Sequence, residues 1–128
     1  MGSTQDEPMP LSNDYVTAPL PDDLQDYQFP TNRLKRTLED PTKTPLVLVA
    51  CGSFSPPTFL HLRMFEMALD YVKINTDFEI VGGYLSPVSD AYKKAGLASA
   101  EHRIRMCSIG AETSTWLDVD NWEAGEFT

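Results

Sequence analysis

A continuous apolar run that ends in glycine and leads into an amphipathic helix constrains the fold of this chain most. The run is "PLVLVACG", residues 45–52, and its lack of alternation is typical of a strand buried on both faces of a parallel sheet. Apolar residues then recur at three- and four-residue steps from residue 58 to residue 74, at Leu62, Phe65, Leu69 and Val72, widened by Met64, Ala68 and Tyr71. We predict a strand, the tight turn "GSFSPPT" and a helix.

Two further strands and a second helix follow in alternation. "DFEIVGGYLSP", residues 77–87, and "STWLDVDNWEA", residues 114–124, have the composition of strands. Between them, Ser99 is a suitable N-cap for a helix that continues to about Glu112. The order β-α-β-α-β predicts an α/β fold: a partial doubly wound, Rossmann-like parallel sheet with right-handed crossovers. Three strands with an exposed edge make a poor independent domain, so we expect a fragment of a longer protein.

Residues 1–43 differ in composition from the rest. They are rich in Pro, Asp, Ser and Thr, and their apolar residues follow no period, so we predict a disordered acidic tail. Within it, "NRLKRTLE" could form a short helical turn. We interpret its basic residues, Arg33, Lys35 and Arg36, as a solvated face rather than as a localisation signal.

The charge and the cysteines exclude several classes of protein. A formal net charge of −9 disfavours non-specific binding to nucleic acid or to an anionic membrane. Cys51 and Cys107 lie among apolar residues without a metal-ligand spacing, and we predict two buried thiols in a reducing compartment. No apolar run is long enough to span a bilayer and no signal peptide is apparent, so we expect an intracellular protein.

The strand-to-helix turn has the features of an anion site. Ligands of open α/β sheets bind beyond the carboxyl ends of the strands, where Gly52 permits close approach to the backbone. Thr58 and His61 share a face at the helix N-terminus, whose free N–H groups and dipole favour an anion. A neutral histidine can donate to a phosphate, and a protonated one can also stabilise a leaving pyrophosphate. Taken alone, however, a histidine on the first turn of an amphipathic helix is more often a packing or capping residue. The patterns G-x-G-x-x-G and Walker A are absent, which disfavours dinucleotide-dependent oxidoreductases and P-loop enzymes.

Three motifs in order resemble one known family. "GSFSPPTFLHLRMFEMA", "YLSPVSDAYKKAGLASAEHRIRM" and "VDNWEA" resemble the eukaryotic nicotinamide/nicotinate mononucleotide adenylyltransferases over residues 47–124. The segment "DYQFPTNRLKR" is similar to the fungal branch. The resemblance implies that residues 44–128 form the N-terminal half of a nucleotidyltransferase domain whose C-terminal half is absent.

The resemblance also implies a reaction. ATP and nicotinamide or nicotinate mononucleotide would give NAD or deamido-NAD and pyrophosphate, with Mg²⁺ accompanying ATP and no covalent enzyme intermediate. The expected location is the nucleus, the cytoplasm or both, and the full-length protein could form a homo-oligomer. No metal-ligating side chain is expected.

The family's functional residues map onto this chain by motif. The signature pair would be Thr58 and His61, with His61 meeting the ATP phosphates. The other binding residues would be Gly52, Ser53 and Phe54 at the turn, Tyr92 and Lys94 near the mononucleotide, and Trp122 and Glu123 near the nicotinamide. Without the resemblance, Lys94 reads as part of a solvated loop, and Trp122 and Glu123 as a half-buried ring and a surface charge.

Two alternatives stay open at this stage. The family's later S-x-T-x-x-R segment has no counterpart in these 128 residues, so we expect an incomplete ATP site. A non-catalytic nucleotide-binding or interaction module is therefore one alternative. The other is an adenylyl- or cytidylyltransferase with a different phosphorylated acceptor, against which "DAYKK" and "NWEA" speak.

Overall fold

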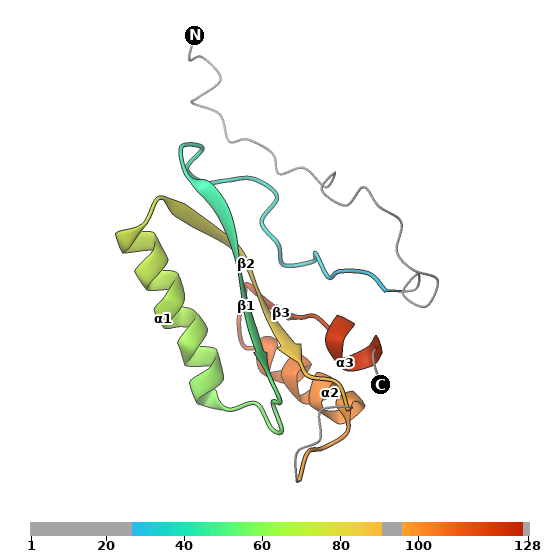
Figure 1. The fold of residues 1–128 in the computed structure, drawn as a ribbon. Coiled ribbons are helices and arrows are strands. Elements are labelled where there is room, and N and C mark those ends of the chain that lie inside the picture. Colours follow the sequence, from blue (N-terminus) through green and yellow to red (C-terminus); the bar gives the residue numbers. More distant parts are fainter. Residues whose placement is uncertain (1–26, 91–95, 127–128) are drawn as a thin grey trace.

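The computed structural model describes residues 27–90 and 96–126 as a parallel sheet with helices (Figure 1). The elements in order are β1 (Thr44–Gly52), α1 (Phe59–Asn75), β2 (Phe78–Pro87), α2 (Ala100–Ala111), β3 (Leu117–Val119) and α3 (Trp122–Glu126). The strands lie in the order β1-β2-β3, and both pairs are parallel. Gly52 pairs with Pro87, and Leu85 with Val119, so all three carboxyl ends lie at one edge of the sheet. The predicted α/β class and alternation are confirmed.

Helices α1 and α2 pack against the same face of the sheet. Phe65 of α1 and Cys107 of α2 belong to one buried cluster with Leu85 of β2 and Leu117 of β3. Trp116 extends this cluster: its ring lies edge-on to Phe65 at 5.9 Å, and its indole N–H donates to Glu66 at 2.9 Å. The core is therefore the layer between the sheet and these two helices.

Residues 27–38 lie on the other side of the sheet from α1, along β2 (Figure 1). The Tyr84 hydroxyl donates to the Pro30 carbonyl at 2.6 Å, and the Lys35 backbone N–H donates to the Val81 carbonyl at 2.8 Å. Leu38 is buried. These contacts cover the face of β2 that the helices leave open.

The prediction of a disordered tail up to residue 43 is therefore wrong for residues 27–43; residues 1–26 lie outside the described residues. Arg33 shows why composition misled, because its guanidinium Nη1 donates to the carbonyls of Ala111, Ser114 and Leu117, at the end of α2 and the start of β3. A segment that is fastened by hydrogen bonds to distant carbonyls does not need regularly spaced apolar residues. Its sequence therefore looks like that of a disordered segment. The predicted helical turn at residues 32–39 is also wrong, since turns and bends occupy this stretch.

The prediction that both faces of β1 are buried is wrong. Val49 is 57% exposed and Val47 and Cys51 are also exposed, whereas β2 is buried from residue 80 to residue 87. The cause is strand order, because β1 is an edge strand of the described sheet and β2 is central. Of the two predicted buried thiols, only Cys107 is buried.

Element boundaries agree with prediction for the helices and less well for the last strand. Ser99 caps α2, as predicted, by accepting from the His102 N–H at 3.3 Å. The inward stripe of α1 is narrower than expected, because Met64 and Tyr71 are exposed. Strand β3 has only three residues, and α3 begins at Trp122 where the strand was expected to continue. In the described ranges, no helix is both long and apolar enough to cross a membrane.

Candidate functional site

The start of α1 brings Thr58 and His61 together at the carboxyl edge of the sheet. Thr58 has extended backbone angles and is the N-cap of α1, with His61 at the third helical position. The His61 side chain turns back over the cap: the Thr58 N–H donates to Nδ1 at 2.7 Å, and the Thr58 hydroxyl lies 3.1 Å from the same nitrogen. The spacing of the two residues thus produces a capping box with histidine in the place usually taken by Glu or Gln.

This hydrogen bond determines which nitrogen of neutral His61 carries the proton. Because Nδ1 accepts from a backbone N–H, its lone pair is in use and the proton of the neutral ring is on Nε2. The ring is half-buried, with its orientation supported by Phe54, whose ring centroid lies 5.0 Å away in an edge-to-face arrangement. Nε2–H is a hydrogen-bond donor with a defined direction. The capping role considered for His61 is present, and it orients the donor needed for the phosphate role.

The electrostatics of this helix end favour an anion. Helix α1 is 17 residues long and carries no acidic residue in its first turn. The partial positive charge of its N-terminus is therefore not offset locally, unlike that of α2, which has Glu101 in its first turn. Free backbone N–H groups at such a terminus bind phosphates.

The turn between β1 and α1 is held by the ring of Phe54. Phe54 adopts a left-handed backbone conformation, with φ of 48°, and its side chain is 2% exposed in the core. The left-handed conformation costs about 1–2 kcal/mol for a residue with a Cβ, and burial of the ring offsets this. A Cβ at Gly52 would lie 3.2 Å from the Phe54 ring, so this glycine makes room for the turn itself. Because the whole residue is buried, Phe54 supports the turn from within the core rather than lining an open site.

The remaining predicted site residues lie across the same edge or outside the described residues. Trp122 and Glu123 begin α3, directly after β3, and Trp122 is 40% exposed. Adjacent strands are about 4.8 Å apart, which puts the ends of β1 and β3 about 10 Å from each other. Tyr92 and Lys94 lie outside the described residues.

Sequence reasoning missed Arg103, a fully buried arginine beneath the turn. Its guanidinium donates to the Ser53 carbonyl at 3.0 Å and to Asp90 at 3.2 Å. A signal was available: Arg103 lies on one helical stripe with Ala100, Cys107 and Ala111, all buried, which marks it as inward-facing.

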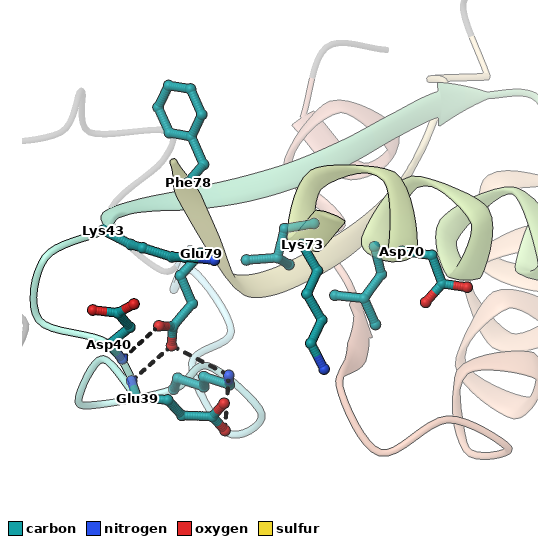
Figure 2. A pocket seen from close by; sticks show the side chains of 10 residues that line it. Glu39, Asp40, Lys43, Asp70, Lys73, Phe78 and Glu79 are labelled. Carbon is teal, nitrogen blue, oxygen red and sulfur yellow. Dashed lines mark hydrogen bonds and ion pairs between the residues drawn. The ribbon is translucent and has the colours of Figure 1, made fainter. Parts of the chain in front are cut away.

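A pocket of the described residues lies at the opposite edge of the sheet. It has a volume of about 400 Å³ and is lined by Lys35, Glu39, Asp40, Lys43, Leu69, Asp70, Lys73, Phe78, Glu79 and Ile80. In Figure 2 the Glu79 carboxylate points toward the backbone at residues 39–40, and it accepts from the N–H groups of Glu39 at 2.8 Å and Asp40 at 2.9 Å. Burial raises the pKa of Glu79, but these hydrogen bonds outweigh it and hold the pKa below its usual range. Glu79 thus serves the fold, and size alone does not make this pocket the functional site.

The described residues do not build a site for the Mg²⁺ that the resemblance implies. No three His, Cys, Asp or Glu side chains within residues 27–90 and 96–126 gather where they could hold a metal ion.

Comparison with known proteins gives consistent matches. The model of the cytidylyltransferase-like family matches residues 49–127. The chain is 63% identical over 102 residues to nicotinamide/nicotinic acid mononucleotide adenylyltransferase 2 of Saccharomyces cerevisiae, covering 79% of this chain and 26% of the relative. It is 60% identical over 102 residues to the nicotinamide/nicotinic acid mononucleotide adenylyltransferase of Schizosaccharomyces pombe, which covers 79% of this chain and 28% of that relative. It is 50% identical over 101 residues to that of Arabidopsis thaliana, which covers 79% of this chain and 42% of that relative.

These matches confirm the resemblance drawn from the three motifs, and the two yeasts fit the similarity to the fungal branch. The chain spans about a quarter of the length of the yeast relatives.

Proposed function

Because the chain belongs to the cytidylyltransferase-like family, we propose that it supplies the phosphate-binding half of an adenylyltransferase site. The substrates in this proposal are ATP and nicotinamide or nicotinate mononucleotide, and the products are NAD or deamido-NAD and pyrophosphate. Support comes from relatives whose names give this mononucleotide and this transfer. The chain covers only part of them, so the activity is proposed for the whole protein.

The observation that carries the proposal is the Thr58–His61 pair at the start of α1. In the proposed step, an oxygen of the mononucleotide 5′-phosphate bonds to the α-phosphorus of ATP, and the bond from that phosphorus to the bridging oxygen of pyrophosphate breaks. The Nε2–H of His61 and the free N–H groups of α1 would donate to the phosphate oxygens. Their contribution is positioning and charge stabilisation, because direct attack needs no nucleophile from the protein.

Three further features belong to the same proposal. Trp122 and Glu123 would contact the nicotinamide part, and Tyr92 and Lys94 the mononucleotide phosphate. Mg²⁺ would enter with the phosphates of ATP. We also propose a reducing compartment, the nucleus or the cytoplasm, which the exposed and unpaired Cys51 supports.

Turnover in a chimera tests the assignment of His61. The matching segment of the S. cerevisiae relative would be replaced by this chain, and NAD formation measured from ATP and nicotinamide mononucleotide. His61→Ala should lower turnover by about 100-fold or more, as loss of one preorganised donor does.

His102→Ala is the matched control. His102 also lies at the third position of its helix, with Nδ1 3.0 Å from the hydroxyl of the N-cap Ser99, but α2 is not the signature helix. His102→Ala should keep turnover within about twofold of wild type. Loss of a cap contact lowers stability by about 1 kcal/mol, but it removes no group that donates to a phosphate. Equal losses in both variants would show that His61 acts only through helix capping, and the assignment would fail.

Calorimetry on the 128-residue chain separates the proposal from a non-catalytic binding module. Binding of nicotinamide mononucleotide or pyrophosphate, weakened by His61→Ala, supports the site described above. An inactive chimera that still binds these ligands would favour the binding module. Faster turnover with another phosphorylated acceptor would replace the substrate and leave the site in place.

A further inference from the structure

Arg103 is the largest fully buried side chain of the described residues, although it is charged. A buried guanidinium is costly unless its N–H groups are hydrogen-bonded and its charge is paired. Arg103 meets both conditions: Nε donates to the Ala98 carbonyl at 2.8 Å, Nη1 to the Ser53 carbonyl at 3.0 Å and Nη2 to Asp90 Oδ1 at 3.2 Å. All three nitrogens are used, each on a different residue.

These three acceptors come from two separate loops at the carboxyl edge. Ser53 follows β1, whereas Asp90 and Ala98 both follow β2. Two more hydrogen bonds join the same groups: the Ala98 N–H donates to Ser55 Oγ at 2.9 Å, and the Ala100 N–H donates to Asp90 Oδ1 at 2.7 Å. We call Arg103 and these five contacts the Arg103 network. It is the side-chain connection between the turn that leads to His61 and the segment after β2.

The position of the network matters because of what the two loops carry. The first loop leads directly into Thr58 and His61. In the second, Asp90 follows the end of β2, and Ala98 lies just before the start of α2. The guanidinium therefore joins the end of β2 and the start of α2 to the turn that leads to Thr58.

An apolar side chain would fill this volume at least as favourably for stability, since buried ion pairs are seldom the most stable solution. It would not bond three acceptors at once. A lysine would keep the charge, but its single ammonium group lacks the planar fork that reaches acceptors in three directions. Arginine at position 103 therefore contributes a fixed arrangement of three acceptors more than it contributes stability.

We propose that Arg103 is a positioning residue that holds the loop after β1 and the segment after β2 in one fixed arrangement. It touches no substrate. Through the network it fixes the turn that leads to Thr58 and His61 against Asp90 and Ala98. It thereby keeps the phosphate donors of α1 in place, and this functional part rests on the proposed adenylyltransferase site.

The test compares Arg103→Met with Arg33→Met in the 128-residue chain. Arg33 is a matched control, because its guanidinium also contacts three acceptor oxygens; these are all backbone carbonyls and lie at the far end of α2. Hydrogen–deuterium exchange is followed at the N–H groups of Ala98 and Ala100, which belong to the network. Arg103→Met should speed exchange there by about tenfold or more, which corresponds to loss of about one charged hydrogen bond. Arg33→Met should speed exchange at residues 112–114 and leave Ala98 and Ala100 within about twofold of wild type.

Calorimetry with nicotinamide mononucleotide gives the functional readout. Both Arg103→Met and Arg103→Lys should weaken binding by about tenfold, whereas Arg33→Met should stay within about twofold even if it unfolds more easily. Full affinity in Arg103→Lys would show that charge alone is needed and would overturn the positioning role. Equal losses in the Arg103 and Arg33 variants would attribute the effect to general stability and overturn it as well.

Two provisions keep the test decisive. If Arg103→Met does not fold, Asp90→Asn replaces it, because the amide keeps the shape and one oxygen but removes the ion pair. Exchange at Ala98 and Ala100 should then speed up in the same pattern, but by a smaller factor. If the wild-type chain binds no mononucleotide, the proposed function fails for this chain. The exchange result still decides whether Arg103 holds the two loops: unchanged exchange at Ala98 and Ala100 would refute it.

Discussion

Replacing Arg33 by Met tests the claim that residues 27–43 are part of the folded structure. The Met side chain keeps most of the apolar stem but removes the guanidinium. The three carbonyls that lose a donor belong to Ala111, Ser114 and Leu117. They lie at the end of α2 and the start of β3, so the loss acts where residues 27–43 are joined to the rest of the fold.

The size of the effect follows from the geometry of one nitrogen. All three contacts come from Nη1, which has two hydrogens, so two good hydrogen bonds exist at a time rather than three. Ala111 O keeps another donor, the Ser114 N–H at 3.0 Å. With about 1.5 kcal/mol for each hydrogen bond from a charged donor, we expect Arg33→Met to lower the free energy of unfolding by about 3 kcal/mol.

Urea denaturation followed by far-UV circular dichroism measures this change. Arg36→Met is the control from the same segment, because Arg36 is exposed and its bond to the Thr31 hydroxyl at 3.1 Å lies in solvent. It should change stability by less than about 0.5 kcal/mol. If Arg33→Met is as stable as Arg36→Met, the segment is not fastened to the sheet in solution, and the reasoning about residues 27–43 is refuted.

Three further predictions concern packing, thiols and acid. Gly83→Ala should destabilise the chain by about 1–3 kcal/mol, because the added Cβ would lie 2.5 Å from the Trp116 ring. Gly110→Ala should stabilise the chain by up to about 1 kcal/mol, because the Cβ would enter open space on α2. Opposite or equal shifts of the two urea midpoints would contradict this. Cys51 should react rapidly with an alkylating reagent because it is exposed, whereas Cys107 should react only on unfolding because burial raises its pKa to about 11. Two rapidly added labels per chain, measured by mass spectrometry, would rule out this difference between the thiols. Glu79→Gln should flatten the loss of stability as the pH falls below about 4.5, the pKa of this carboxyl in the unfolded chain. A carboxyl with a lowered folded pKa stabilises the fold above that pH and loses its contribution as the pH falls through the folded pKa, so urea midpoints with identical pH profiles would count against the prediction.

The sequence predicted those parts of the fold that depend on short-range pattern. The start of α2 after its N-cap Ser99 follows from local residue preferences and was found where expected. The start of α1 was expected at residue 58, and the structure places Thr58 one position earlier, as the N-cap. Strand burial was harder, because an apolar run does not reveal strand order. "PLVLVACG" has the composition of a central strand, yet in the described sheet β1 is at the edge.

Long-range hydrogen bonds explain most of what the sequence did not predict. Arg33 bonds residues about eighty positions away, and Arg103 bonds a carbonyl fifty positions away. Neither partner can be identified from spacing, although the place of Arg103 on a buried stripe was readable. For the candidate site, the motif identified Thr58 and His61, but only the geometry showed that Nδ1 is occupied and Nε2 is the donor.

The course of residues 27–43 across the sheet has a practical consequence for shortening the protein. A version that starts at residue 44, where the apolar run begins, would remove the Tyr27 hydroxyl bonded to Asp120, the Pro30 carbonyl on Tyr84 and the guanidinium of Arg33 together. It would also expose the apolar face of β2, a strand whose neighbour β1 already has an open edge. Such a version would be prone to strand-to-strand aggregation, and soluble expression should keep the chain from residue 27 onward.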